Sequence, residues 1–178
     1  MAAILRRLPM PGVDLPALHA TETGHGRPVL LLHGWGTSGR ALEAVAGRLS
    51  GRARVVVVDL PGHGRSPPSP AAGSIEAMGE QVAALVRERG LSRVIVGGWS
   101  LGAMVALAAA DRLGAGAAGL LLLSATPRFV AGDGWDAGLP AEQVDGLTAR
   151  LRISQARALA RFFGSCLAEG ELSGDARA

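Results

Sequence analysis

Four short apolar runs recur along the N-terminal two thirds of the chain, and each ends at a glycine or a polar turn. They are Val29–Leu32, Val55–Val58, Val94–Val96 and Leu120–Leu123. Near-continuous apolar runs of this length are typical of strands that are buried on both faces of a parallel sheet. The pattern therefore predicts four buried strands, and a weaker strand is predicted at Leu18–Thr21.

Helical periodicity fills the intervals between these runs. The predicted helices are Ala41–Leu49, Ile75–Arg89 and Leu101–Leu113. The second helix has one apolar side, formed by Met78, Val82, Leu85 and Val86. Ser74 precedes it and is a residue type that caps helix N-termini. Alternation of strand and helix predicts an α/β fold with a mostly parallel, doubly wound sheet covered by helices.

The pattern changes after Trp135. Two further helices are expected there, with Val144, Leu147 and Leu151 on one apolar stripe and Leu159, Phe163 and Leu167 on another. A length of 178 residues is typical of one domain. We expect residues 1–135 to form the sheet-containing core and residues 136–178 to form a helical segment.

Composition and charge exclude several classes of protein. The sequence is 48% hydrophobic and 19% charged, as in globular proteins, and its net charge of +3 gives little reason to expect a nucleic-acid partner. The single Cys166 excludes an intrachain disulfide and fits a reducing cytoplasm. No secretory apolar region is evident, and charges interrupt the apolar stretch Leu101–Ala125, so no membrane partner is expected.

The segments after the apolar runs are where a site is predicted, because catalytic groups gather at the carboxyl ends of such strands. They are His33–Gly39 (HGWGTSG), Asp59–Ser66 (DLPGHGRS), Gly97–Gly102 (GGWSLG) and Ser124–Phe129 (SATPRF). Three of the four are rich in glycine.

The third segment contains the pattern G-x-S-x-G, formed by Gly98, Ser100 and Gly102. This pattern is the signature of a strained strand-to-helix turn that exposes a serine hydroxyl above the sheet. We expect both glycines to be required, because a side chain at either position would clash with the neighbouring strand or helix. The serine lies at a helix N-terminus, which favours a developing negative charge. The alternative is a tight connection in which Ser100 only caps the helix.

In sequence order, these segments resemble the α/β-hydrolase superfamily, and within it the pimeloyl-[acyl-carrier protein] methyl ester esterases of biotin biosynthesis. The similarity rests on VLLLHGWG (Val29–Gly36), VVDLPGHGRS (Val57–Ser66), GWSLG (Gly98–Gly102) and LLLSATPRFVAGDGW (Leu121–Trp135). The resemblance implies a cytoplasmic serine carboxylesterase with a helical lid at residues 136–178 and no metal or organic cofactor. It also implies an acyl ester substrate presented on acyl carrier protein, and full-length relatives that are monomeric.

The resemblance assigns roles around the G-x-S-x-G turn. Ser100 matches the nucleophile, and the backbone N–H groups of Trp35 and Leu101 match the two donors to the oxyanion. His33 matches a structural residue of the His-Gly turn rather than a catalytic base.

Further residues match substrate and carrier positions. Substrate contacts are implied for Trp35, Trp99, Leu101 and Phe162. Arg157 and Arg161 match arginines that receive the acidic carrier protein, and Arg150 extends the patch. The alternative for each arginine is a solvated helix face.

A dinucleotide-binding site is a competing interpretation of the first segment. Gly34, Gly36 and Gly39 form G-x-G-x-x-G after a strand, and Asp59 follows 20 residues beyond Gly39. On this interpretation the protein would be an oxidoreductase, and the Asp59 carboxylate would bind a ribose hydroxyl of the dinucleotide. That interpretation leaves the second and third segments unexplained, whereas the hydrolase interpretation predicts that Asp59 orders the loop Leu60–Ser66.

The base that a serine nucleophile needs is missing from the expected place. The order in this fold is serine, acid, histidine, but all four histidines of the chain precede Ser100. Asp133 or Asp136 would serve as the acid, and neither supplies the base. The resemblance implies two more strands beyond the lid that carry these groups, so the predicted fold is C-terminally incomplete.

Three explanations stay open. The chain is part of a longer esterase, a second polypeptide supplies the strands, or the protein binds ligands without catalysis. A broad-specificity short-chain carboxylesterase, or a related lactone or C–C hydrolase, is the alternative activity.

Overall fold

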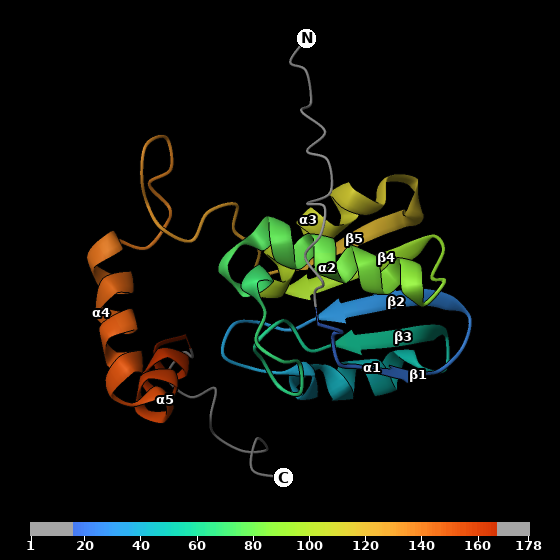
Figure 1. Cartoon of the computed structure of the whole chain (residues 1–178), viewed down its shortest axis with the longest axis horizontal. Helices are drawn as coiled ribbons and strands as arrows, with labels where there is room; N and C mark the ends of the chain where they lie inside the picture. The colour runs from blue at the N-terminus through green and yellow to red at the C-terminus, as the bar shows by residue number, and fades with distance from the viewer. Residues whose placement is uncertain (1–15, 167–178) are drawn as a thin grey trace. The chain divides into compact units, whose positions relative to one another are not determined.

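The computed structural model describes residues 16–166, which form two compact units that meet in sequence between Thr126 and Pro127. The first unit contains a five-stranded sheet in the order β1-β3-β2-β4-β5 (Figure 1). The strands are β1 (Ala20–Thr23), β2 (Arg27–Leu32), β3 (Ala53–Val58), β4 (Val94–Trp99) and β5 (Ala117–Leu123). Only β1 runs antiparallel to its neighbour, which confirms the predicted mostly parallel sheet. The weak strand predicted at Leu18–Thr21 begins two residues later than expected.

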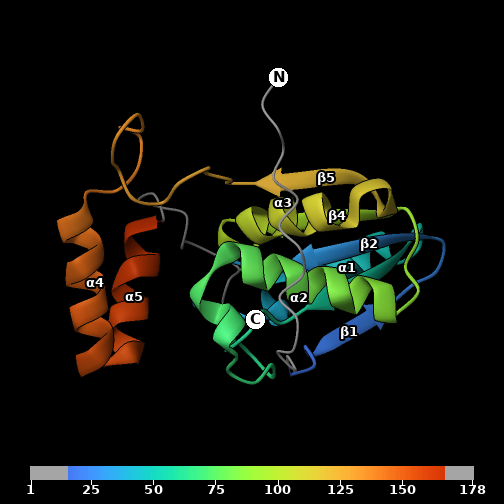
Figure 2. The ribbon, with the colours of Figure 1, turned by 45° about the horizontal axis from the view of Figure 1, so that its top comes forward.

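Helices cover both faces of this sheet. They are α1 (Glu43–Leu49), α2 (Ile75–Glu88) and α3 (Leu101–Leu113), with short 3-10 turns η1 (Gly39–Leu42), η2 (Pro70–Gly73) and η3 (Gly114–Gly116). The helices α2 and α3 lie on one face, and α1 lies on the other (Figure 2). The Ser74 side chain accepts a hydrogen bond from the Ala77 N–H at 3.2 Å, so the predicted cap of α2 is confirmed.

The core consists of two layers that share the central strands. Against α2 and α3 lie Leu30, Leu32, Val56, Val58, Val94 and Val96, together with the predicted apolar side of α2. Against α1 lie Val29, Leu31, Val55 and Val57. The strands β2, β3 and β4 are therefore buried on both faces, as the continuous apolar runs predict.

The strand β5 departs from this prediction. Its residues Leu120–Leu123 retain between 41% and 48% of their full exposure. β5 is the last strand of the sheet and pairs only with β4 (Figure 2). An apolar run shows that a strand is suited to burial, but burial also needs neighbours, and in the described residues β5 has a neighbour on one side only.

The second unit contains the two helices expected after Trp135, α4 (Ala141–Ile153) and α5 (Gln155–Cys166). Ala158 is the one buried residue of these two described helices. Leu167 and the remaining residues 168–178 of the predicted lid lie outside the described residues, and the role of α4 and α5 as a lid stays a prediction. None of the helices in residues 16–166 has the length and apolar character needed to cross a bilayer.

Candidate active site

Ser100 forms the turn that joins β4 to α3. Its backbone angles are φ 53° and ψ −116°, a strained conformation for a residue with a side chain. The Ser100 N–H donates a hydrogen bond to the Leu123 carbonyl at 2.9 Å, which fixes the turn to the end of β5. The strained turn predicted for this serine is confirmed.

The glycines on either side of Ser100 allow close backbone contacts. A Cβ atom at Gly98 would meet the backbone of Gly102, and one at Gly102 would meet the carbonyl oxygen of Leu32 at the end of β2. In each case the obstacle is backbone, which has little freedom to move. The prediction that both positions require glycine is therefore confirmed.

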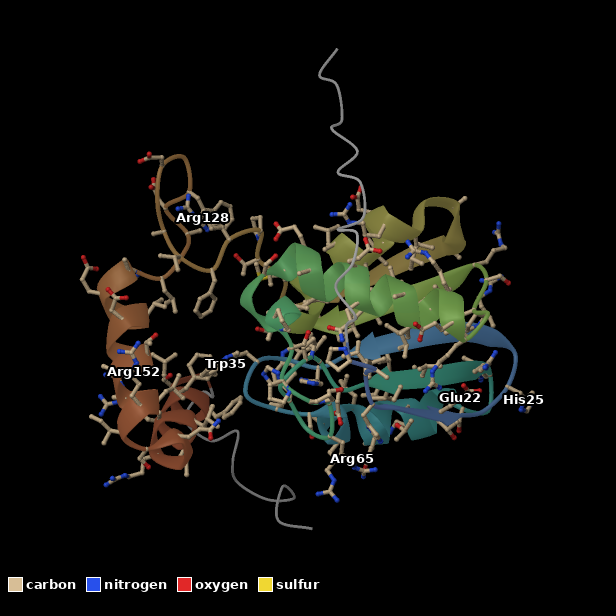
Figure 3. All side chains as sticks on the ribbon, viewed as in Figure 1. Glu22, His25, Trp35, Arg65, Arg128 and Arg152 are labelled. Atoms are coloured by element: carbon tan, nitrogen blue, oxygen red, sulfur yellow. The ribbon has the colours of Figure 1, made fainter. Side chains whose placement is uncertain are left out.

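The turn after β2 packs directly against the Ser100 turn. A Cβ atom at Gly34 would lie 3.0 Å from Cε3 of Trp99, so the indole ring covers this glycine. Trp35 follows Gly34 and lies beyond the carboxyl end of β2 (Figure 3). The structure therefore brings Trp35, Trp99, Ser100 and Leu101 to the same end of the sheet, and their catalytic roles stay predictions.

His33 is a buried structural residue of this turn. Its Nε2 accepts a hydrogen bond from the Leu60 N–H at 3.0 Å, and its Nδ1 donates to the Gly34 carbonyl at 2.8 Å. Burial lowers the pKa of His33, and the nearby His63 lowers it further, against the opposing effects of the Gly34 bond and Asp59. Both ring nitrogens are engaged in these hydrogen bonds, so His33 is not available to take a proton from Ser100.

Asp59 organises the loop after β3. Its Oδ1 accepts from the Gly39 N–H at 2.6 Å, and its Oδ2 accepts from the Arg65 N–H at 2.9 Å and lies 3.2 Å from His19 Nδ1. Burial raises the pKa of Asp59, but the two N–H donors and the neighbouring imidazoles outweigh it and hold the pKa below its ordinary value. The predicted loop-ordering role is confirmed. Because both oxygens are engaged within the protein, the dinucleotide-binding interpretation loses its ribose-binding group.

The other histidines also lie in structural or remote positions. His19 contacts Asp59, and His63 lies after β3 with its Nδ1 3.0 Å from the Pro61 carbonyl oxygen. His25 is in the turn between β1 and β2, at the opposite end of the sheet from Trp35 (Figure 3). Within residues 16–166, no histidine forms a hydrogen bond with the Ser100 hydroxyl.

The predicted substrate and carrier residues beyond the sheet lie on α5 of the second unit. Arg157 and Arg161 line a hollow of about 340 Å³ together with Arg150 of α4. Phe162 and Arg161 line a cavity of about 620 Å³ between α4 and α5. Their roles in binding stay predictions.

The two candidate acids, Asp133 and Asp136, are exposed in the loop that precedes α4. The proposed role of either residue as the catalytic acid stays a prediction.

Two contacts that shape the site have no signal in the sequence. The bond from Ser100 to the Leu123 carbonyl depends on the register of β4 and β5. The pairing of His19 with Asp59 joins residues 40 positions apart, with three strands between them in the sequence. Neither is found by a local pattern, because each arises only when separate segments meet in the sheet.

The comparisons with known proteins agree with this geometry. A family model described as the alpha/beta hydrolase fold matches residues 27–161. The pimeloyl-[acyl-carrier protein] methyl ester esterase of Sodalis glossinidius is 38% identical over 143 residues, which are 80% of this chain and 53% of that protein. The enzyme of the same name from Methylococcus capsulatus is 46% identical over 118 residues, 66% of this chain and 44% of that protein. The chain spans about half the length of the curated relatives it matches.

Solved esterases share the same architecture. The esterase EaEST from Exiguobacterium antarcticum has a TM-score of 0.74 at 27% identity, covering 82% of this chain and 55% of that one. A thermophilic esterase from Thermogutta terrifontis has a TM-score of 0.66 at 32% identity, covering 77% and 48%. The family model matches most of the chain, including strands β2 to β5 and the strained Ser100 turn, so this chain belongs to the α/β-hydrolase family.

Proposed function

We propose that this chain carries the nucleophile and the oxyanion donors of a serine carboxylesterase acting on the methyl ester of a carrier-bound acyl chain, in biotin biosynthesis. The observation that carries the proposal is the Ser100 turn, held strained between β4 and the N-terminus of α3. The names of these two curated relatives support pimeloyl-[acyl-carrier protein] methyl ester as the substrate.

The reaction proceeds through an acyl-enzyme. The Ser100 hydroxyl attacks the ester carbonyl carbon, and a general base takes its proton. The tetrahedral intermediate expels methanol, which leaves with that proton. Water then attacks the acyl-serine ester, which releases the free acid and restores Ser100.

The oxyanion that forms in both steps needs N–H donors already in position. We assign this role to the backbone N–H groups of Leu101 and Trp35. Leu101 is the first residue of α3, where backbone N–H groups lack an acceptor inside the helix. Loss of one such donor costs about 3 kcal/mol of transition-state stabilisation. The rigid contact between Gly34 and Trp99 supports the required positioning of both turns.

Substrate and carrier recognition belong to the same proposal. The aromatic side chains of Trp35, Trp99 and Phe162 would contact the acyl chain. Arg157 and Arg161 would meet an acidic carrier surface, and their clustering with Arg150 around one hollow favours this, since gathered positive charge attracts an acidic partner. The exposed single Cys166 fits a cytoplasmic site of action.

Acylation of Ser100 by p-nitrophenyl butyrate tests the proposal. p-Nitrophenolate departs without needing a proton, so acylation requires only that the Ser100 hydroxyl loses its own proton, which water or hydroxide takes slowly when no histidine is present. Deacylation also requires water to be activated by a base, so it is slower. We expect a burst of up to one equivalent of p-nitrophenolate from the 178-residue chain, and mass spectrometry should locate one butyryl group on Ser100.

Two serine variants complete that experiment. Ser100→Ala should abolish the burst, while Ser92→Ala, at an exposed serine just before β4, should retain it. A burst of the same size from Ser100→Ala would refute the proposed function, as would no acylation of a folded chain after prolonged reaction at pH 9, where hydroxide takes the serine proton.

The solved esterases favour a second candidate, a carboxylesterase of broad specificity. Comparison of p-nitrophenyl butyrate with a p-nitrophenyl ester of monomethyl pimelate separates the two. Faster acylation of Ser100 by the pimelate ester supports the first candidate, and equal acylation rates for the two esters support the second.

A further inference from the structure

A polar hollow of about 330 Å³ lies in the first unit, between β1 and the helical segment that follows β2. Thr21 of β1 and Val57 of β3 line it, and these two residues are direct partners in the sheet, so they share one face. Val57 belongs to the face covered by α1, which packs on β3 rather than on the edge strand β1. The space beside α1 forms the hollow, which we call the β1 hollow. Its volume is within the range of small-molecule sites.

A chain of contacts that begins at Asp59 holds the Arg65 guanidinium at this hollow. The Asp59 Oδ2 lies 3.2 Å from His19 Nδ1, and Nε2 of the same imidazole lies 3.3 Å from Arg65 Nη1. The carboxylate accepts the Nδ1 proton, which leaves Nε2 to accept a hydrogen bond from Arg65. That bond uses one of the five N–H donors of the guanidinium. Within residues 16–166 the Arg65 side chain forms no ion pair, so its other donors are available to a ligand.

Two further charged side chains line the hollow from the opposite wall, Arg40 of η1 and Glu43 at the start of α1. Both are exposed, and among the described residues neither side chain forms an ion pair or a hydrogen bond. They are three residues apart in a helical segment, which places them on the same side of it. The Ser38 hydroxyl also lines the hollow and caps no backbone N–H. The hollow therefore presents two positive charges and one negative charge that this part of the chain leaves unpaired.

Asp59 adds a second negative charge, but its carboxylate is already satisfied. Its two oxygens accept the N–H groups of Gly39 and Arg65, and His19 lies beside one of them. The Asp59 carboxylate therefore orients the imidazole, and through it the guanidinium, without itself needing a ligand. A guanidinium held in place before binding loses less conformational entropy when a ligand binds.

We propose that the β1 hollow binds a small zwitterion, whose acidic group pairs with Arg40 and Arg65 and whose ammonium group pairs with Glu43. Guanidinium groups form strong hydrogen bonds with carboxylates and phosphates. A ligand with negative charge only would be repelled by Glu43, and one with positive charge only would be repelled by the two arginines. An amino acid and an aminoalkyl phosphate both have the required pair of charges.

The β1 hollow is separate from the proposed catalytic site. No residue of the Gly98–Gly102 turn lines it. Figure 3 shows Arg65 well apart from Trp35, which lies beyond the carboxyl end of β2. The inference therefore does not rest on the proposed function, and Ser100→Ala should bind the zwitterion as tightly as the natural chain does.

Isothermal titration calorimetry of the 178-residue chain at low ionic strength tests the proposal. The probes are γ-aminobutyrate for the carboxylate source and O-phosphoethanolamine for the phosphate source, and the tighter of the two identifies the acidic group. Each is compared with its analogue that lacks the amine, butyrate or ethyl phosphate. We expect one-to-one binding of the tighter zwitterion, with its analogue about two- to fivefold weaker, as is typical of one exposed ion pair. No binding of either zwitterion to the folded chain would overturn the proposal, as would equal affinity for zwitterion and analogue.

Three variants at exposed positions locate the two charged groups of the ligand. Arg65→Gln should weaken binding by about tenfold, because it removes a charged donor. Arg48→Gln is the matched control, since Arg48 is exposed on α1 and does not line the hollow. Glu43→Gln should remove the preference for the zwitterion over its analogue. A preference that survives Glu43→Gln, or equal losses from Arg65→Gln and Arg48→Gln, would overturn the assignment.

Nuclear magnetic resonance of the histidine side chains provides a test that needs no variant. His19 lines the hollow, whereas His25 lies in the turn between β1 and β2 at the opposite end of the sheet. Binding should shift the imidazole resonances of His19 and leave those of His25 unchanged. Shifts confined to His25 would place the ligand elsewhere and overturn the proposal.

The outcomes separate this inference from the proposed function. Zwitterion binding by a chain whose Ser100 is never acylated supports the β1 hollow and refutes the esterase. Acylation of Ser100 by a chain that binds neither zwitterion supports the esterase and refutes the β1 hollow.

Discussion

Replacement of Asp59 by asparagine tests how the loops at the carboxyl ends of β2 and β3 are held. The carboxylate accepts hydrogen bonds from the backbone N–H groups of Gly39 and Arg65, one on each oxygen. Asparagine has the same shape but only one oxygen. Whichever way its amide is turned, one backbone N–H faces another donor, and the charge that strengthens both bonds is lost.

The expected loss follows from these contacts. A hydrogen bond to a charged group contributes about 1.5–3 kcal/mol, and a buried donor left without a partner costs about 1–3 kcal/mol. Asp59 is almost fully buried, so water cannot replace the lost acceptor. We expect Asp59→Asn to lower the free energy of unfolding by about 3 kcal/mol, which for a chain of this size lowers Tm by roughly 6–12 °C.

Urea unfolding followed by tryptophan fluorescence measures this difference. Asp111→Asn is the matched control, because Asp111 is exposed on α3 and its replacement should change the free energy of unfolding by less than about 0.5 kcal/mol. Equal urea midpoints for the two variants would refute the reasoning.

The pH dependence gives a second check on Asp59. Its pKa is lowered by folding, so its contribution is complete at neutral pH and is lost as pH falls below about 4. The difference between the natural chain and Asp59→Asn should therefore shrink in acid. A difference that stays constant down to acid unfolding would contradict the assigned pKa direction.

Three further predictions concern the turn glycine, the buried imidazole and the cap of α2. Gly102→Ala should abolish acylation of Ser100 by p-nitrophenyl butyrate and lower the free energy of unfolding by about 1–3 kcal/mol, because its Cβ meets backbone at the end of β2. Gly47→Ala, in a helix position with open space, should stabilise the chain by about 0.5–1 kcal/mol, and equal losses from both would contradict this account. The pKa of His33 is lowered by folding, so the unfolded chain binds more protons and stability should fall as pH drops below about 6.5. His33→Gln should show a smaller fall in urea midpoint between pH 7 and pH 5.5, and an identical fall would assign the effect to other groups. Ser74→Ala should cost about 1 kcal/mol in urea unfolding through loss of the cap, with Ser92→Ala, at an exposed serine before β4, as its control. Equal effects of the two substitutions would count against the cap.

The local patterns of the sequence determined most of the first unit. Continuous apolar runs located four strands, and helical periodicity with Ser74 located α2. The G-x-S-x-G spacing located the strained serine, because a turn this tight excludes a Cβ at Gly98 and Gly102 whatever the rest of the chain does. These features depend on near neighbours in sequence, which is why a single sequence reveals them.

The tertiary structure alone decided which polar groups are engaged and which apolar residues are covered. His33 and Asp59 follow two different strands, and only the parallel pairing of β2 and β3 brings their side chains to the backbone of the opposite loop. Leu120–Leu123 has the same apolar pattern as the buried strands and is nevertheless exposed. Burial requires a neighbour on each side and a helix on each face, and a strand's own residues carry no information about whether those neighbours are present.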